Sequence, residues 1–280
     1  MSLSADTAAI AIRVEDAADP QLVAELRRRR VSLTRFGVLV AILAVWQASV
    51  SFGLVGAFWV SSPVLVAREI WFLLTTGELA RDVAMTVLEA LIAFVISSAL
   101  GVAAGLLLAR LPFWDDVLAP FVVAFNSLPR IALAPLIILW FGIGITAKVV
   151  TAFTLTFFIL LVNTLTGAKH VDNDILTIAR LIGASERDIL RKVTLPSALP
   201  WIFAGLELGL TYSLLGVIVA EILASNQGLG YLIESSAGNF NTAGVFAGLF
   251  TLAAVAWVFS TLMRRLQGRL LRWKPSDQSA

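Results

Sequence analysis

The chain contains 280 residues, of which 59% are hydrophobic and only 14% are charged, and its mean hydropathy is +0.89. A soluble domain usually carries about 25% charged residues, so this composition excludes a water-soluble globule and indicates a membrane protein. The absence of cysteine and the presence of a single histidine, His170, exclude disulfide frameworks, thiol catalysis and histidine-clustered metal sites.

The N-terminal segment, residues 1–35, is polar and contains the basic run Arg27 to Arg30. Asp19 and Pro20 resemble a helix cap followed by a first-turn proline. We therefore predict a short basic amphipathic helix over residues 20–34 on the inner membrane surface, after a disordered tail. A cleaved signal peptide would have a shorter apolar core and a small-residue cleavage site near its start. We interpret the apolar segment that follows as an uncleaved start-transfer helix.

Six apolar segments are long enough to cross a bilayer, whose core of roughly 30 Å needs about 20 helical residues. Three stretches carry no charge, and three others carry only one charged residue each, Glu89, Arg130 or Glu207. Buried helices of soluble proteins rarely stay apolar for so long, and the runs lack the two-residue alternation of a β-barrel. We predict an all-α membrane protein with a transmembrane domain over residues 36–264. The predicted spans are residues 36–60, 83–109, 117–142, 148–168, 197–224 and 242–263.

An even number of spans places both termini on the same side of the membrane. Of the 21 Lys and Arg residues, 17 fall in the N-terminal segment, the loops at 110–116 and 169–192, or the end of the chain from Arg264 through the C-terminal tail at 265–280. Basic residues in short loops mark the cytoplasmic side, so we predict cytoplasmic termini in a bacterial inner membrane, surrounded by lipid. This distribution explains the net charge of +2 without nucleic acid. The external segment at residues 61–81 is predicted to be an amphipathic helix or lid.

Pairs of glycines four residues apart recur in three of the predicted spans. Such pairs let helix backbones approach closely in a bilayer, where hydrophobic burial cannot drive association. They favour a tightly packed bundle that includes a subunit interface, although glycine is also common in membrane helices in general. The pairs are Gly101 and Gly105, Gly205 and Gly209, and Gly244 and Gly248.

The cytoplasmic loop at residues 169–196 is longer than a connector between two spans requires. Asp172 offers a helix start, and Ile175, Ile178 and Ile182 recur at helical spacing. Gly183 interrupts this pattern, and a second helix is predicted to run until Pro196. We expect two helices with few exposed apolar side chains, which is typical of a surface that docks a partner.

This loop resembles the cytoplasmic signature of importer permeases of the ABC superfamily, written as EAA, three residues, G, nine residues, I-x-LP. Gly183 is followed ten positions later by Val193 and then by Leu195 and Pro196. Of the opening triplet at residues 177–179 only the last residue matches. Thr177 replaces the glutamate, so the resemblance implies no salt bridge at that position. Further blocks are similar to the nitrate/sulfonate/taurine permease subfamily, at residues 127–144, 171–185, 195–210, 219–233 and 270–275.

The resemblance implies the fold of a type I importer permease with a cytoplasmic coupling helix at residues 175–192. It also implies a second permease copy, two ATP-hydrolysing subunits that dock on the coupling helix, and a periplasmic substrate-binding protein. Transport would proceed by alternating access between two packings of the spans. The residues implied in ATPase coupling are Thr177, Ala179, Arg180, Gly183, Ala184, Ser185, Val193, Leu195 and Pro196.

The chain is predicted not to be an enzyme. It lacks the G-x-x-x-x-G-K-[ST] loop that cradles phosphates, and no Ser/His/Asp constellation can form around the single His170. We expect no catalytic residue, cofactor or metal on this chain, with ATP and Mg held by the partner ATPase.

Ionisable groups within spans are costly and are therefore candidates for the transport pathway. Arg130 lies between Pro129 and Pro135, where the span is predicted to be irregular and to expose backbone groups to a cavity. It would suit an anionic substrate, or it would pair with Glu207 or Glu89, or extend to the inner surface. Glu207 stands where the family pattern has a basic residue, which argues against a route lined only for anions.

Polar residues near the ends of other spans complete the candidate set. Glu221 precedes the segment from Asn226 to Gly230, which is an external gate, a contact for the binding protein, or a plain helix-ending turn. The asparagines within spans bond either a neighbouring helix or the substrate. The candidate pathway or gate residues are Asn126, Arg130, Asn163, Glu207, Glu221 and Asn226.

The predicted function is the permease subunit of an ATP-driven importer for a small anionic solute of the nitrate, sulfonate or taurine class. Related permeases also serve aromatic acids, thiamine pyrimidine precursors and flavins, which are the alternative substrates. An ion-coupled secondary transporter is a remote alternative, because no internal repeat is found and the loop has no role in such a protein.

Overall fold

The computed structural model describes residues 20–270, apart from the side chains of residues 20–25 and 173, and within this range all regular structure is helical. The predicted tail before residue 20 and most of the 265–280 tail lie outside the described residues. The chain divides between residues 65 and 66 into two compact units. Among the described residues, five helices are long and apolar enough to cross a membrane, or six when one bent pair counts as a span. The prediction of an all-α chain is confirmed.

The first unit contains one long helix, α2 (Pro20–Ser51), and one short helix, α3 (Ala57–Val60). The basic residues at 27–30 continue directly into the apolar span, so α2 is a single helix where the sequence predicted a separate surface helix over 20–34. It also ends nine residues before the predicted end of the first span, because Gly53 takes a left-handed conformation with φ of 73°. The indole of Trp46 donates a hydrogen bond of 3.2 Å to the carbonyl of Val60 and closes this turn.

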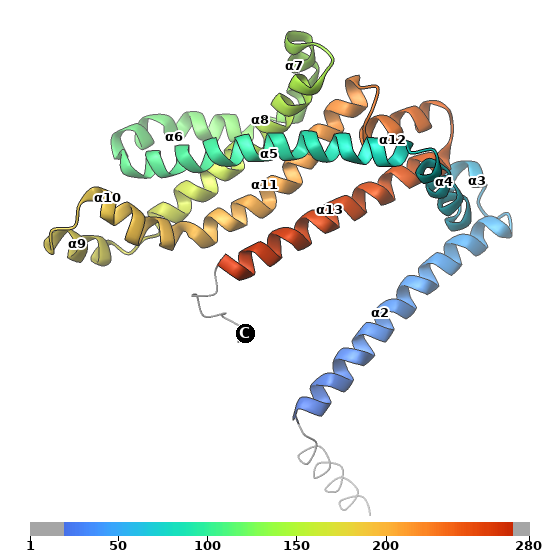
Figure 1. Cartoon of the computed structure of the whole chain (residues 1–280), viewed down its shortest axis with the longest axis horizontal. Helices are drawn as coiled ribbons and strands as arrows, with labels where there is room; N and C mark the ends of the chain where they lie inside the picture. The colour runs from blue at the N-terminus through green and yellow to red at the C-terminus, as the bar shows by residue number, and fades with distance from the viewer. Residues whose placement is uncertain (1–19, 271–280) are drawn as a thin grey trace, which may run out of the picture. The chain divides into compact units, whose positions relative to one another are not determined.

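The second unit is built around three long helices, α5 (Glu78–Arg110), α8 (Ile145–Lys169) and α11 (Leu195–Ala224), which pack side by side (Figure 1). Ala93 of α5, Ala152 of α8 and Val217 of α11 are buried together in one apolar cluster. Small side chains at these positions allow the helix backbones to approach closely, which favours van der Waals contact in a bilayer.

The glycine pairs predicted from the sequence lie where helices approach one another. A Cβ atom on Gly105 would lie 2.8 Å from the carbonyl oxygen of Leu161 on α8, and one on Gly205 would lie 2.9 Å from Cβ of Asn163. The third pair belongs to α13 (Thr242–Leu270), where Gly248 faces Ile233 of α12 (Leu229–Gly238). These glycines pack helices within one chain, and a role for them in a subunit interface stays a prediction.

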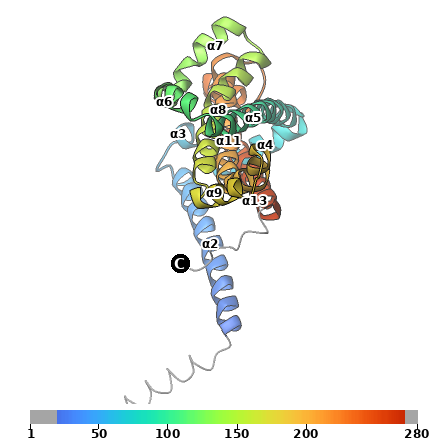
Figure 2. The ribbon, with the colours of Figure 1, turned by 90° about the vertical axis from the view of Figure 1, so that its left-hand side faces the viewer.

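The third predicted span is broken. It consists of α6 (Pro112–Ser127), the 3-10 helix η1 (Arg130–Leu133) and α7 (Ala134–Phe141), and its two halves are bent by 80°. Leu128 precedes Pro129 and is extended, with φ of −64° and ψ of 138°, because a following proline disfavours the helical conformation. The irregularity expected at Arg130 is therefore present, and Figure 2 shows α7 projecting beyond the bundle at the far side from α9.

The segment between the first and second spans forms α4 (Pro63–Thr75), within the range predicted for an external helix. Glu69 on this helix accepts a hydrogen bond of 2.9 Å from the side-chain amide of Asn241, which precedes α13. This contact joins the helix to the turn between α12 and α13.

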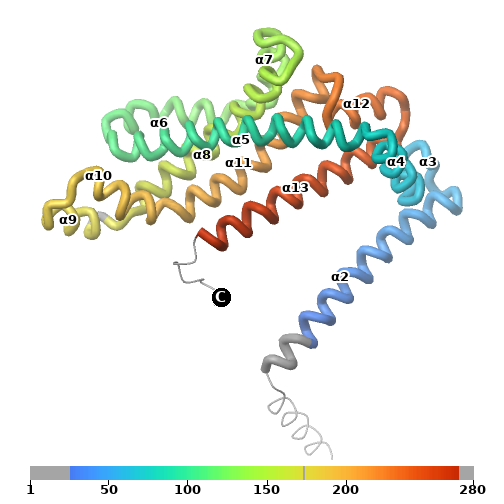
Figure 3. Tube along the Cα trace, viewed as in Figure 1, coloured from blue at the N-terminus to red at the C-terminus, as the bar shows by residue number. Residues whose placement is uncertain are grey.

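The long loop between α8 and α11 forms α9 (Asn173–Leu181), α10 (Glu186–Ile189) and the π-helical turn η2 (Leu190–Thr194), which Figure 3 shows as a compact hairpin. The sequence placed the end of the second helix at Pro196, but Pro196 lies in the first turn of α11. A proline is tolerated there because the first-turn amides have no helical partner. The chain therefore passes from the hairpin into α11 without a break.

We predict that Gly216→Ala lowers the thermal stability of the purified protein. The added Cβ would lie 2.5 Å from Cα of Ala152, and a backbone atom in the middle of α8 cannot yield as a flexible side chain can. Overpacking of this kind costs about 1–3 kcal/mol. Gly268→Ala in α13 is the matched control, because nothing lies within 4 Å of its added Cβ. Melting followed by tryptophan fluorescence compares the two variants, and an equal melting temperature would contradict the close approach.

Candidate functional site

Each helix of the hairpin, α9 and α10, begins with a local capping interaction. The Asp172 carboxylate accepts a hydrogen bond of 2.9 Å from the backbone amide of Asp174, and the Ser185 hydroxyl accepts one of 3.2 Å from the amide of Asp188. Both are standard helix starts, in which a side chain satisfies an unpaired amide. Between them Gly183 has φ of 84°, which ends α9 in the left-handed conformation that glycine favours.

Polar contacts attach this hairpin to the helix bundle. Arg110, the last residue of α5, donates a hydrogen bond of 2.8 Å to the backbone carbonyl of Glu186. The Glu186 carboxylate also lies 3.3 Å from Nε of Arg180 on α9. Within the hairpin α9 is thus tied to α10, and α10 is tied to α5, so the hairpin is attached to the bundle by polar contacts as well as by the chain.

The hairpin exposes apolar side chains, which contradicts the expectation of few such exposures. Ile178 is 58% exposed, Leu181 80% and Ile182 79%, whereas Ala179 and Ile189 are buried between the two helices. A cavity of about 310 Å³ lies between α9, α10 and η2. Its lining is Ala179, Ile182, Gly183, Ala184, Asp188, Ile189, Lys192 and Val193. The sequence-based expectation was wrong because it placed the apolar face of α9 against the protein, whereas most of this face is exposed.

Most residues implied in coupling therefore lie together in or beside this hairpin. Ala184 and Val193 line the cavity, and Ser185 caps α10. Leu195 and Pro196 begin α11, and Thr177 lies on the exposed side of α9. The spacing of the signature thus brings its residues to one compact element.

A buried polar network lies at the other end of the bundle. Glu221 is 1% exposed, and its carboxylate accepts hydrogen bonds from the Thr86 hydroxyl at 2.8 Å and from the amide of Gly230 at 2.7 Å. The amide of Leu229 donates to the Thr86 hydroxyl at 2.8 Å. The amide of Gly228 donates to the Asp82 carboxylate at 3.0 Å. These bonds hold the turn between α11 and α12 against α5.

An ion pair is buried beside this network. Nζ of Lys148 on α8 lies 2.8 Å from the Glu89 carboxylate on α5, and the two residues are 3% and 0% exposed. The span predicted over residues 148–168 begins three residues too late, because α8 begins at Ile145, so Lys148 lies inside a helix that packs against α5. A signal was available in the spacing of Asp82, Thr86 and Glu89. Intervals of four and three residues place these polar side chains on one face of a helix.

Arg130 contacts neutral groups and an aromatic ring. Its guanidinium donates hydrogen bonds to the carbonyls of Thr154 at 3.0 Å and Leu155 at 3.2 Å, and to the side-chain oxygen of Asn126 at 3.0 Å. It also lies 5.4 Å from the ring centre of Phe158. Pairing with Glu207 or Glu89, which the sequence left open, does not occur.

The other pathway candidates are dispersed. Glu207 lies 3.3 Å from Arg264 of α13, a partner that the sequence did not identify. The Asn163 side chain donates to the carbonyl of Ile159 on its own helix, at 2.8 Å. Asn226 is exposed in the turn after α11. Asn126 and Arg130 alone of the six candidates are joined by a hydrogen bond among the described residues.

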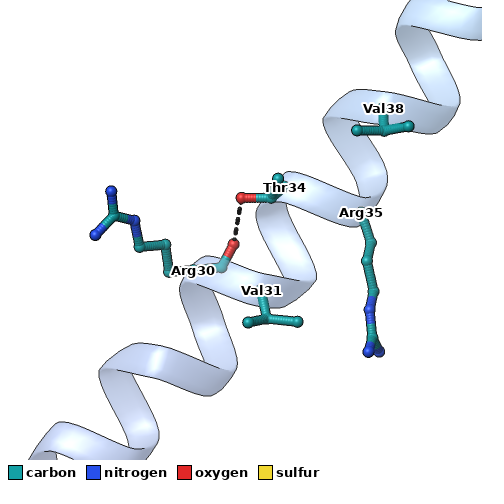
Figure 4. Close-up of a pocket in the computed structure, with 5 residues that line it drawn as sticks. All are labelled: Arg30, Val31, Thr34, Arg35 and Val38. Atoms are coloured by element: carbon teal, nitrogen blue, oxygen red, sulfur yellow. Dashed lines mark hydrogen bonds between the residues drawn. The ribbon is translucent and has the colours of Figure 1, made fainter.

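The first unit has a groove along one face of α2, shown in Figure 4. Its lining residues, from Arg30 to Val38, all come from the same helix, and the Thr34 hydroxyl bonds the carbonyl of Arg30 at 2.8 Å. A groove made by one helix encloses nothing, so it is a helix surface and not a binding site. In the described part of the chain, no group of three or more His, Asp or Glu side chains is placed to hold a metal ion.

We predict that Lys148→Met destabilises the protein by about 3–5 kcal/mol, because the Glu89 carboxylate would remain buried without a cation. Adding Glu89→Leu should recover most of this loss, since the double variant buries no unpaired charge. Lys192→Met removes an exposed ion pair with Asp188 and should change little. Chemical or thermal denaturation in detergent measures the three variants, and a double variant no better than the single one would contradict the ion-pair explanation.

Several known proteins have sequences similar to that of this chain. Residues 97–274 match the family described as binding-protein-dependent transport system inner membrane component. The riboflavin transport system permease protein RibX of Chloroflexus aurantiacus is 36% identical over 85% of this chain and 89% of its own length. The formylaminopyrimidine transport permease protein ThiX of Halalkalibacterium halodurans is 32% identical, over 83% and 92% of the two chains. The taurine transport system permease protein TauC of Escherichia coli is 28% identical, over 88% and 90%.

A solved structure shares the fold. An inward-facing structure of the MetNI methionine ABC transporter superposes with a TM-score of 0.55 at 21% identity, covering 72% of this chain and 94% of the other. The likeness confirms the fold of a type I importer permease, and the family implies assembly with an ATPase and a binding protein. The chain belongs to the binding-protein-dependent inner membrane components, as a multi-pass permease subunit of an ABC importer of the nitrate/sulfonate/taurine type.

Proposed function

We propose that this chain forms half of the translocation pathway for a small anionic solute, with an identical second copy forming the other half. A periplasmic binding protein delivers the solute, and ATP with Mg is bound and hydrolysed on separate ATPase chains. The permease itself binds no cofactor and catalyses no reaction. Its spans alternate between two packings that open the pathway to one side or the other.

The observation that carries this proposal is the exposed apolar face of the α9–α10 hairpin. Leu181 and Ile182 are each about four-fifths exposed at the tip of a hairpin between two spans. Exposed apolar side chains on an extramembrane element mark a contact with another protein. The ATPase subunit is the partner that this family of permeases requires, so the hairpin acts as the coupling helix.

The orientation follows from the same assignment. If the hairpin contacts the ATPase, it lies in the cytoplasm, and the basic residues of the N-terminal segment and the C-terminal tail then lie on that side as well. The turn at Asn226, at the other end of α11, faces the periplasm and the binding protein. The chain therefore has both termini in the cytoplasm.

The substrate class rests on Arg130, a cation within a span that has no carboxylate among its hydrogen-bonding partners. The names of the relatives RibX and ThiX supply the alternative. They are named for riboflavin and formylaminopyrimidine, so a planar heteroaromatic solute, or an aromatic acid, remains the second candidate. No described feature favours an ion-coupled secondary transporter.

We predict that Ile182→Glu abolishes co-purification of the permease with its ATPase subunit, because a charge would enter the apolar contact. Gly183→Leu should act similarly, since a side chain is strained at φ of 84° although it would meet nothing within 4 Å. Phe240→Asp is the control, because Phe240 is 75% exposed but lies between α12 and α13. Pull-down of the tagged permease measures association. Wild-type recovery of the ATPase with Ile182→Glu and Gly183→Leu would refute the coupling role.

We predict that single cysteines report opposite sides of the membrane. The chain has no natural cysteine, so Arg187→Cys in the hairpin and Asn226→Cys in the turn after α11 can be labelled selectively. Both side chains are exposed. A membrane-impermeant maleimide should label the first only in inside-out vesicles and the second only in spheroplasts. The reverse pattern would refute the orientation.

A further inference from the structure

Arg130 carries a charge that nothing in the described part of the chain neutralises. Its hydrogen-bond acceptors are the carbonyls of Thr154 and Leu155 and the side chain and carbonyl of Asn126, all of which are neutral. Two other cations of the spans have carboxylate partners, because Lys148 lies 2.8 Å from Glu89 and Arg264 lies 3.3 Å from Glu207. An uncompensated charge within a membrane span is costly, so a negatively charged partner from outside the chain would be stabilising there.

An apolar cavity is lined by Phe158, the residue whose ring the Arg130 guanidinium contacts. It has a volume of about 390 Å³, lies between α5, α6 and α8, and has no polar atom on its exposed lining. Its aromatic lining residues are Phe121, Phe125, Phe157 and Phe158. The volume is within the range of sites for small ligands, about 300–1,000 Å³.

Phe158 is in contact with the Arg130 guanidinium and also lines the cavity. The Arg130 guanidinium lies 5.4 Å from the centre of its ring, and the same ring lines the cavity. Phe125 stacks on Phe158 with ring centres 5.9 Å apart, and Phe157 meets it edge to face at 5.2 Å. Phe158 therefore has one stacked and one edge-to-face aromatic neighbour, which are the two arrangements that aromatic rings prefer.

We propose that Arg130 and this phenylalanine cluster form a binding site for an organic anion with an aromatic body, a carboxylate or a sulfonate. Nη1 and Nη2 of Arg130 already donate to four acceptors, so the anionic group would accept a charge-assisted hydrogen bond from Nε–H, while the ring would enter the apolar cavity. The site rests on the proposed function, because it assigns a substrate class to the same pathway. It disfavours an inorganic anion, which would leave the cavity unfilled, and a zwitterion, whose ammonium group would meet only apolar side chains.

A phospholipid is a poorer occupant, because its headgroup belongs at the membrane surface. Arg130 contacts α8 at Thr154, nine residues from Ile145 and fifteen from Lys169. At 1.5 Å per residue, this contact lies roughly 14 Å from one end of the helix and 22 Å from the other. A lipid phosphate would have to leave the interface to reach the guanidinium, whereas a small solute in a pathway passes that depth.

The test measures binding of 4-methylbenzenesulfonate to the full-length chain in lipid nanodiscs by saturation-transfer NMR. Arg130→Gln should weaken binding by about 10- to 100-fold, because a charge-assisted hydrogen bond is lost. Arg130→Lys should retain part of the affinity, and Phe158→Leu should reduce saturation of the ring protons. Arg68→Gln, at an exposed arginine of α4, and Phe250→Leu in α13 are the matched controls. Melting temperatures identify any variant that fails to fold.

Several outcomes would overturn the site. These are no binding to the wild-type chain, unchanged affinity in Arg130→Gln, or equal binding of the neutral probe 4-methylbenzyl alcohol. Displacement of the probe by added phospholipid, with no dependence on Arg130, would assign the cavity to an acyl chain. Co-purification with the ATPase is measured on the same wild-type sample. Loss of probe binding with the ATPase retained overturns the anion site alone, whereas loss of the ATPase overturns the proposed function.

Discussion

The bilayer offers no hydrogen bonds, and this constraint governs the arrangement of polar groups throughout the second unit. The turn between α11 and α12 exposes three successive backbone amides, at Gly228, Leu229 and Gly230, and each donates to a side chain that is itself buried. Thr86 connects the two halves of this network, because its hydroxyl accepts from Leu229 and donates to Glu221. The irregular end of α11 is therefore stable only because α5 presents polar groups at the matching positions.

The same constraint acts on two different parts of the second unit, the closely packed bundle and the broken span. Gly101, Gly105 and Gly216 remove side-chain volume, so α5, α8 and α11 approach almost to backbone contact. The span of α6 and α7 cannot continue through Pro129, and the bend leaves polar backbone groups within the membrane region. Arg130 bonds the carbonyl of Asn126, before the break, and those of Thr154 and Leu155 on the neighbouring helix. Arg130 therefore both satisfies these backbone carbonyls and carries a charge that has no carboxylate partner among the described residues.

Much of the fold could be predicted from the sequence, because hydropathy, proline and glycine act locally. The apolar runs and the prolines beside Arg130 predicted long helices and a break, and the spacing around Gly183 predicted the hairpin. Contacts between distant segments could not be predicted in this way. The partner of Glu207 is 57 residues away, and the partner of Glu89 is 59 residues away. A single sequence carries no signal for such pairs. The helical spacing of Asp82, Thr86 and Glu89, which the sequence analysis did not use, indicates only that α5 has a polar face.

The hairpin and the bundle are mechanically continuous, which is what a transmitted movement needs. The turn η2 leads into α11 without a break, α9 follows α8 across a short turn, and Arg110 joins α10 to the end of α5. The hairpin that exposes Leu181 and Ile182 is therefore connected to all three helices of the core at one end. Because these helices pack through glycine and alanine, they have little free volume in which to deform separately. Under the proposed coupling role, the three helices would therefore move as one body.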